Sequence, residues 1–411
     1  MEFIKKTLKR FWPKQKKQIK EVSVLLIYGV ALFILGINVG SGWIQNRVDE
    51  VLHKNDQTSN LPNSLNLSAI QQEYQDIKDN YDGKLTVSQL EDGIAHGLAN
   101  ATGDPYTEYF DPSEAQAFNN DLNSTFSGIG AGLDKDSSGN LIVQEVLSDT
   151  PAQRAGLKVN DVITSINGTS TTNINVDTAV TDIRGAAGTI VKLDVLRGGS
   201  QVLNFSIKRA VIKVPSVNSK IIDGNIGYMQ ITTFGNDTSS LAQTAANMFK
   251  QKDVKGVILD LRGNGGGLVT AAINVSSLWL EPGATIFTEK HDNQVVATNT
   301  ANGNDPLIGI PTVVLIDGDS ASASEITAGA LHDNKAAYLI GEKSFGKGSE
   351  QTIDNLPGGA EIKVTIAHWY TPGDKNINKI GITPNEVVSL PSNSTTDTQE
   401  NAAILYLQSK F

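Results

Sequence analysis

Residues 254–268 read VKGVILDLRGNGGGL, an apolar run that ends in a glycine-rich turn. Similar apolar runs and helical patterns alternate with one another on both sides of it: LAQTAANMFK (241–250), PTVVLID (311–317), ASEITAGALH (323–332) and AAYLIGE (336–342). Strands that alternate with helices are typical of an α/β domain with parallel strands. We therefore predict an α/β core over residues 214–391.

The segment before this core shows a different period. LIVQEV, DVITSING and IVKLDVLR alternate apolar and polar residues and are separated by glycine turns, so we predict a mostly β domain over residues 125–213. Apolar residues recur at spacings of three and four over 67–100, which predicts amphipathic helices within an N-terminal helical segment, 67–124. Residues 392–411 are expected to form a C-terminal tail.

The N-terminus has an uneven charge pattern. Residues 1–21 carry eight basic side chains, and residues 22–43 carry no charge. An apolar run of this length predicts a transmembrane helix, with the basic arm in the cytoplasm and the rest of the chain outside the cell membrane. A cleaved signal peptide is the alternative, but the run is long and lacks a clear cleavage site. Residues 44–66 are read as a linker.

Composition excludes several classes of protein. The net charge of −10 argues against a nucleic-acid partner, which would normally meet a basic face. The chain of 411 residues has no cysteine, so disulfides, thiolate metal sites and a thiol nucleophile are excluded. No metal-ligand motif is present, and we expect no metal and no cofactor.

Two stretches of the β segment indicate a peptide-binding domain. Residues 126–133 read FSGIGAGL, and closely spaced glycines can turn backbone amides into a concavity that holds a carboxylate beside a strand edge. A plain glycine turn is the alternative. The stretch TPAQRAGLKVNDVITSINGTST (150–171) follows, and the two together, in this order, resemble a PDZ domain.

Two sites compete for the chemistry of the core. GEKSFGKGS (341–349) nearly spells a phosphate loop, but Gly348 stands where the Mg²⁺-binding hydroxyl belongs. The other site pairs Lys347 with a serine cluster at a strand-to-helix turn, where free amides favour an oxyanion. Ser322 and Glu325 would also suit a helix capping box without any catalysis. His332 lies about 15 Å along the same helix, whereas a buried, neutral lysine can serve as the base.

The motifs of this second site resemble those of the carboxyl-terminal processing peptidases, or tail-specific proteases, which are serine peptidases with a Ser-Lys dyad. The resemblance runs over residues 67–391 and implies a core of the crotonase/Clp type with an inserted PDZ domain. The matching stretches are ATGDPYTEYF (101–110), DLRGNGGGL (260–268), SASASEITAGALHD (320–333), LIGEKSFGKGSEQ (339–351) and HWYTPGDKNINKIGITPNEVV (368–388).

Carried over by position, the resemblance implies a role for each residue of the site. Ser322 is the expected nucleophile, Lys347 the general base and Gln351 the residue that orients the lysine. The backbone amides of Gly267 and Ala323 are expected to form the oxyanion hole. The glycine turn departs from the family pattern, because Gly263 and Gly265 replace the usual asparagine and proline.

The expected substrates are proteins bound by their C-terminal tails. The resemblance places tail binding at Phe126, Ser127, Gly128, Ile129 and Gly130 and assigns to Arg184 the coupling of the PDZ domain to the active site. The hypothesis is thus a membrane-anchored extracytoplasmic serine endopeptidase, with a homo-oligomer possible. A PDZ scaffold with a silent core and a non-peptidase hydrolase or isomerase are the alternatives; a chymotrypsin-like protease is excluded because its motifs are absent.

Overall fold

The computed structural model describes residues 64–291, 294–391 and 396–411. The chain divides into two compact units, Met1–Lys84 and Leu85–Phe411. The described residues of the first unit form helix α3 (Ser68–Asn80), which has no buried residue. The second unit contains the two regions predicted from the sequence, an α/β core and a mostly β segment, and a further antiparallel sheet.

The core is built on a six-stranded sheet in the order β10-β11-β12-β15-β16-β19, parallel except for the antiparallel edge strand β10. Its strands are β10 (Val217–Ile222), β11 (Ile226–Ile231), β12 (Gly256–Asp260), β15 (Thr312–Ile316), β16 (Tyr338–Gly341) and β19 (Glu386–Val387). All residues of β12 and β15 are buried. This is the pattern of central strands that are covered on both faces.

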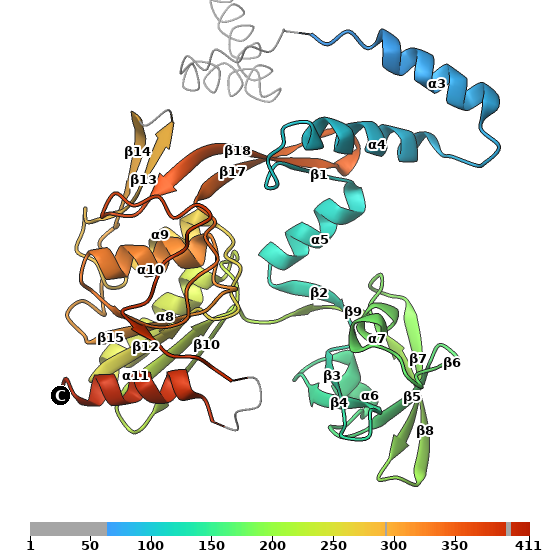
Figure 1. Cartoon of the computed structure of the whole chain (residues 1–411). Helices are drawn as coiled ribbons and strands as arrows, with labels where there is room; N and C mark the ends of the chain where they lie inside the picture. Colours follow the sequence, from blue (N-terminus) through green and yellow to red (C-terminus); the bar gives the residue numbers. More distant parts are fainter. Residues whose placement is uncertain (1–63, 292–293, 392–395) are drawn as a thin grey trace, which may run out of the picture. The chain divides into compact units, whose positions relative to one another are not determined.

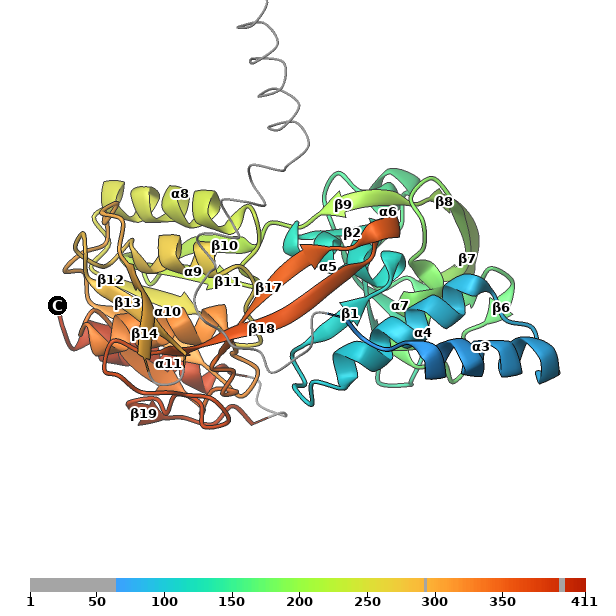
Figure 2. The ribbon, with the colours of Figure 1, turned by 90° about the horizontal axis from the view of Figure 1, so that it is seen from above.

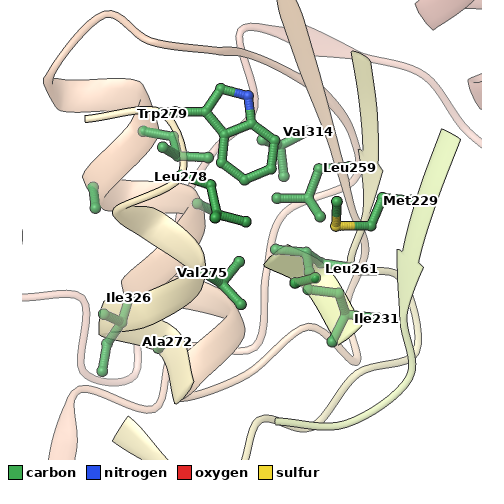
Figure 3. Packing of buried hydrophobic residues seen from close by; sticks show 14 of the residues in the cluster. Met229, Ile231, Leu259, Leu261, Ala272, Val275, Leu278, Trp279, Val314 and Ile326 are labelled. Atoms are coloured by element: carbon green, nitrogen blue, oxygen red, sulfur yellow. The ribbon is translucent and has the colours of Figure 1, made fainter. Parts of the chain in front are cut away.

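Helices cover both faces of this sheet (Figure 1). Alternate strand residues such as Val257 and Leu259 pack toward α8, α9 and α10, while Ile258 packs toward α11 on the opposite face. The apolar residues on each face of the sheet form one cluster. Figure 3 shows the larger cluster, on the face of α8, α9 and α10, where Trp279 and Leu278 approach Leu259 of the sheet. The helices are α8 (Thr238–Gln251), α9 (Val269–Ser276), α10 (Ala323–Asp333) and α11 (Thr398–Gln408). Residues 392–411, expected to be a tail, thus include a helix that packs on the core.

A second, antiparallel sheet joins the core to the N-terminal helical segment. Its long central strand β18 pairs with β1, β13 and β17, as Figure 2 shows for β17 and β18. Its strands and associated helices are α4 (Val87–Asn100), β1 (Glu108–Phe110), α5 (Pro112–Leu122), β13 (Thr285–His291), β14 (Gln294–Thr300), β17 (Ser349–Asn355), η1 (Pro357–Gly359) and β18 (Glu361–Tyr370). The pairing of β1 with β18 brings residues far apart in the sequence together, with Glu108 opposite Lys363.

The mostly β segment has its own apolar core. In strand β7 the alternate residues Val191, Leu193 and Val195 are fully buried, as the period of two predicts. Strands β2 and β9 pair where the chain enters and leaves the segment. Its elements are β2 (Thr125–Gly128), β3 (Ala131–Lys135), β4 (Leu141–Val146), α6 (Pro151–Ala155), β5 (Val162–Ile166), β6 (Thr169–Ser170), α7 (Val176–Ile183), β7 (Ile190–Arg197), β8 (Gln201–Lys208) and β9 (Ala210–Lys213).

The predicted transmembrane helix requires a correction. No helix in the described part of the chain is long and apolar enough to cross a membrane. The longest, α4 and α8, have 14 residues each, about 21 Å at 1.5 Å per residue, against about 30 Å of hydrocarbon. This finding contradicts the transmembrane helix in the predicted fold class and the single-pass membrane location derived from it. Residues 22–43 themselves lie outside the described residues.

Candidate active site

Four of the predicted site residues line one cavity of the core. Ser322, Lys347, Gln351 and Gly267 surround a space of about 330 Å³. Much of the remaining wall is apolar and comes from α5, α9, α10, β17 and β18: Phe118, Leu122, Leu268, Val269, Ile326, Ile353 and Trp369. The structure therefore brings the serine, the lysine, the glutamine and Gly267 together from positions up to 84 residues apart in the sequence.

Ser322 differs from the other two serines of its cluster. The Ser320 hydroxyl donates to the carbonyl of Leu261 at 2.8 Å, and that of Ser324 donates to the carbonyl of Asn264 at 2.8 Å, so both are buried structural groups. The Ser322 hydroxyl lines the cavity and has no acceptor for its proton among the described residues. Its backbone has φ +52°, an unusual and strained conformation at the start of α10. Such a turn presents a side chain outward from the helix N-terminus.

The glycine turn after β12 packs directly against the serine turn. A Cβ built at Gly266 would lie 2.8 Å from the Cβ of Ser322, and one at Gly267 would lie 2.3 Å from the carbonyl oxygen of Phe234. Both glycines have positive φ, +104° and +137°, so side chains are excluded by conformation as well as by space. In the described part of the chain, the backbone N–H groups of Gly267 and Ala323 have no hydrogen-bond acceptor.

The buried carboxylate of Glu325 connects the serine turn to the lysine loop. Its oxygens accept hydrogen bonds from the backbone N–H of Ser322 at 3.0 Å and of Lys347 at 2.8 Å. The hydroxyl of Ser344 at 2.5 Å and the N–H of Gly346 at 2.8 Å complete the set. Burial raises the pKa of Glu325 above its ordinary value, although the four hydrogen bonds act in the opposite direction. One carboxylate therefore sets the spacing between the two loops.

Lys347 has the environment of an amine that loses its proton more easily than usual. Burial lowers its pKa, and the positive charge of Lys363 lowers it further, against the opposing effects of Asp104, Glu108 and Glu325. Its Nζ lies 4.9 Å from the centre of the Tyr106 ring and makes no hydrogen bond to any described residue. The amine is thus placed in the cavity but is not bonded to the Ser322 hydroxyl in this conformation.

Gln351 is held by its amide nitrogen. Nε2 donates to the hydroxyl of Ser349 at 2.9 Å and to the hydroxyl of Thr365 at 3.2 Å. The amide oxygen Oε1 has no donor among the described residues. Gln351 therefore lies in the same cavity as Lys347 with an unused acceptor.

The predicted tail-binding residues line a second cavity, of about 340 Å³, in the mostly β segment. Phe126, Gly128, Ile129, Gly130 and Arg184 belong to its wall, together with residues of β3 and α7. The Arg184 guanidinium lies 5.2 Å from the centre of the Phe126 ring. The fifth loop residue expected at this site, Ser127, donates from its hydroxyl to the carbonyl of Gly185 at 2.8 Å.

Backbone groups of this loop are turned in two directions. The carbonyls of Ile129 and Gly130 accept from Ala152 and Leu147 inside the segment, whereas the amides of Ile129 and Gly130 have no acceptor in the described part of the chain. The strand β3 lies at the edge of the sheet β3-β4-β5-β7-β8. A free edge and unpaired amides are the features that bind an extended peptide.

Reasoning from the sequence missed one residue of the first cavity and two residues close to its lysine. Asp104 and Tyr106, in a turn before β1, face Lys347 and Thr365, and Lys363 of β18 lines the cavity wall. Only the stretch ATGDPYTEYF pointed to this turn, and nothing in the spacing of its residues placed it beside Lys347. Within the described ranges, no group of histidine and carboxylate side chains is arranged to hold a metal ion.

Comparisons with known proteins agree with this architecture. The profile of peptidase family S41 matches residues 225–388, and the PDZ domain profile matches residues 121–196. The carboxy-terminal processing protease CtpA of Bacillus subtilis is 38% identical over 318 residues, covering 77% of this chain and 68% of that protein. A probable CtpA-like serine protease of Staphylococcus haemolyticus is 31% identical over 369 residues, covering 90% of this chain and 72% of that protein.

A solved structure shows the same fold at a lower identity. A putative S41 protease from Bacteroides fragilis aligns with a TM-score of 0.55 at 16% identity and covers 85% of this chain and 100% of that chain. The relatives and the two matching profiles confirm the family resemblance. The chain belongs to peptidase family S41 and is a carboxy-terminal processing serine peptidase with a PDZ domain.

Proposed function

We propose that this peptidase cleaves its substrates with Ser322 as nucleophile and Lys347 as general base. The neutral amine of Lys347 takes the proton of the Ser322 hydroxyl while Oγ attacks the scissile carbonyl carbon. The amides of Gly267 and Ala323 stabilise the resulting oxyanion. The amine then returns the proton to the leaving nitrogen, and water hydrolyses the acyl-enzyme.

One observation carries this proposal: the serine with no acceptor for its proton, the lysine with a lowered pKa and Gly267 with its unpaired amide line one cavity, and the second unpaired amide, of Ala323, directly follows the serine. The amine must approach the hydroxyl before proton transfer. Catalytic hydrogen bonds of an unliganded enzyme often form only with substrate, and a lysine side chain has the rotatable bonds for such a movement. Gln351, with its unused Oε1, would orient the lysine.

We propose further that the PDZ cavity selects the substrate by its C-terminal tail. The tail would add to the free edge of β3, and its terminal carboxylate would meet the unpaired amides of Ile129 and Gly130. Binding at the tail raises the local concentration of the scissile bond at the core. Arg184, which lies beside Phe126, would couple tail binding to the active site, as the family resemblance implies.

The test is cleavage of a poorly folded reporter protein with an apolar C-terminal tail by the full chain and three variants. Ser322→Ala and Lys347→Ala remove nucleophile and base, and each is expected to lower kcat at least 100-fold. Lys347→Arg is the matched control for charge, because a guanidinium keeps its proton and should be equally inactive. Cleavage by Lys347→Ala at the rate of the parent would remove the base from the proposal. Tail binding without cleavage by the parent would favour a scaffold.

A further inference from the structure

The turn that precedes β1 lies beside Lys347 and is bonded to β18 through its aspartate. The Asp104 carboxylate closes this turn, because it accepts from the N–H of Tyr106 at 3.2 Å and the hydroxyl of Thr107 at 2.8 Å. The pairing of β1 with β18 then places the turn beside Thr365, whose N–H donates to the hydroxyl of Thr107 at 3.2 Å. A segment more than 200 residues before the lysine thereby becomes part of its surroundings.

The hydroxyl of Thr365 bonds to two side chains, and the chemistry of one decides the orientation of the other. It lies 2.5 Å from Oδ2 of Asp104 and 3.2 Å from Nε2 of Gln351. Burial raises the pKa of Asp104, but the hydrogen bonds from Thr365 and Thr107 outweigh it and leave that pKa below its ordinary value. An ionised carboxylate only accepts hydrogen bonds. Thr365 must therefore give its single proton to Asp104.

A hydroxyl that has given away its proton can only accept from its second neighbour. The atom of Gln351 that faces Thr365 must then be the amide nitrogen, and the second N–H of that nitrogen goes to Ser349. Amide oxygen and nitrogen have nearly the same shape, so a hydrogen-bond network of this kind is what fixes their positions. The oxygen Oε1 remains as the free acceptor on the side of Gln351 that the network does not use.

We propose that Asp104 is a positioning residue that acts through Thr365 to fix the amide of Gln351, so that Oε1 is kept as an acceptor for the amine of Lys347. This inference rests on the proposed function, in which Lys347 is the base. Without Asp104 the Thr365 hydroxyl is free to donate to Oε1, and the amide can turn its NH₂ group toward the lysine. The ammonium form of Lys347 would then face a donor in place of an acceptor, and the lysine would lose its fixed position.

The hydrogen-bond relay from Asp104 through Thr365 to Gln351 also crosses the boundary of the region that matches the peptidase profile. Thr365 and Gln351 lie within residues 225–388, but Asp104, in the N-terminal helical segment, lies before the start of both the PDZ profile and the peptidase profile. The N-terminal segment therefore contributes to the chemistry of the core as well as to its sheet.

The experiment measures kcat and KM of the full chain on the tailed reporter between pH 6 and 10. Thr365→Val removes the hydroxyl and keeps the Asp104 charge, and we expect kcat to fall roughly tenfold with KM changed less than about twofold. Thr365→Ser keeps the hydroxyl and should return kcat to within about twofold of the parent. Asp104→Asn replaces a carboxylate that can only accept hydrogen bonds by an amide that can also donate one, so Thr365 no longer has to donate to residue 104. This variant should resemble Thr365→Val. An acceptor on an ammonium group favours its charged form, so Thr365→Val should also move the acid limb of kcat to lower pH.

Tyr109→Phe is the matched control for stability. It removes one hydrogen bond of the same segment, from the Tyr109 hydroxyl to Asp92 at 2.7 Å, and leaves the relay intact. It should lower Tm as Thr365→Val does without changing kcat or the acid limb. If Thr365→Val keeps the kcat and acid limb of the parent while Lys347→Ala is inactive, the relay is overturned and the proposed function stands. If Lys347→Ala is fully active, both are overturned, because no base then needs positioning.

Discussion

The pair formed by Glu350 and Glu289 gives the chain a pH-dependent stability that one substitution should remove. Glu350 of β17 and Glu289 of β13 lie on either side of β18, opposite Ala367 and Trp369 respectively. Burial, followed by the negative charge of Glu289 and a hydrogen bond with it, raises the pKa of Glu350 to about 7. One oxygen of Glu350 is buried without a partner among the described residues. The protein therefore buries a carboxyl that prefers to keep its proton.

The sign of the effect follows from where the proton is held. Below pH 4.5 the Glu350 carboxyl is protonated in both the folded and the unfolded chain, so its ionisation does not lower the free energy of unfolding. Between pH 4.5 and 7 the unfolded chain releases this proton and the folded chain keeps it, so the free energy of unfolding falls as pH rises. A pKa rise from 4.5 to about 7 corresponds to roughly 3 kcal/mol. We expect about half of this, because Glu350 is only partly buried and solvent screens its charge.

The variant Glu350→Gln keeps the size of the side chain and cannot ionise. Relative to the parent, its free energy of unfolding should rise by about 1.5 kcal/mol between pH 4.5 and pH 8. The measurement is urea unfolding at six pH values, followed by tryptophan fluorescence, since Trp279 and Trp369 are buried in the core and residues 121–196 contain no tryptophan. Since none of the four tryptophans lies in residues 121–196, the fluorescence does not report on the PDZ domain.

A double-mutant cycle with Glu289→Gln separates the pair from burial alone. If the two carboxyls interact, either single variant removes their repulsion, and the double variant gains less than the sum of both. A difference between Glu350→Gln and the parent that stays constant from pH 4.5 to pH 8 would refute the raised pKa and, with it, the reasoning from burial and charge.

Three further predictions concern the active site and the tail. Gly266→Ala should lower the free energy of unfolding by about 1–3 kcal/mol and lower Tm, because the new Cβ would lie 2.8 Å from the Cβ of Ser322 on a backbone with φ +104°. Gly265→Ala is the control, because a Cβ at that position has no atom within 4 Å. Equal Tm values for the two variants would contradict the prediction. In the proposed mechanism only the neutral amine of Lys347 accepts the serine proton, so the kcat of the parent should fall with falling pH through a lysine pKa below 10.5. A flat profile from pH 6 to 10 would contradict this. Amidation of the reporter's C-terminus should raise KM at least fivefold, because it removes the charge that meets the amides of Ile129 and Gly130 in the proposed binding mode. An unchanged KM would place recognition elsewhere.

The sequence was sufficient to predict the elements that follow a simple period. Strands β12 and β15 and helix α10 could be predicted because their apolar residues are continuous or recur at helical spacing. The cluster of Ser322 and Lys347 was found by motif, and both residues line one cavity in the structure. Their chemical roles stay predictions until the variants are measured.

Other parts could not be predicted because they depend on contacts between distant segments. Asp104 contacts Thr365 only because β1 pairs with β18, and no local sequence pattern at either residue predicts this contact. Glu325 was read as part of a helix capping box, although its carboxylate also accepts from the lysine loop. Residues 392–411 were expected to form a tail, yet they include helix α11, whose Ala403 and Leu407 are fully buried against the sheet.

Glu325 shows why the serine and the lysine need a common anchor. The two groups come from different loops, and a shift of even 1 Å between them would cost much of the rate of a proton transfer. A carboxylate that accepts from the N–H groups of Ser322 and Lys347 holds the two backbones at a fixed distance and leaves both side chains free. In the proposed mechanism, backbone anchoring of this kind would let the lysine side chain move toward the hydroxyl when substrate arrives, while its loop stays in place. The proposed relay from Asp104 would act on one of the two side chains that Glu325 leaves free, the amine of Lys347.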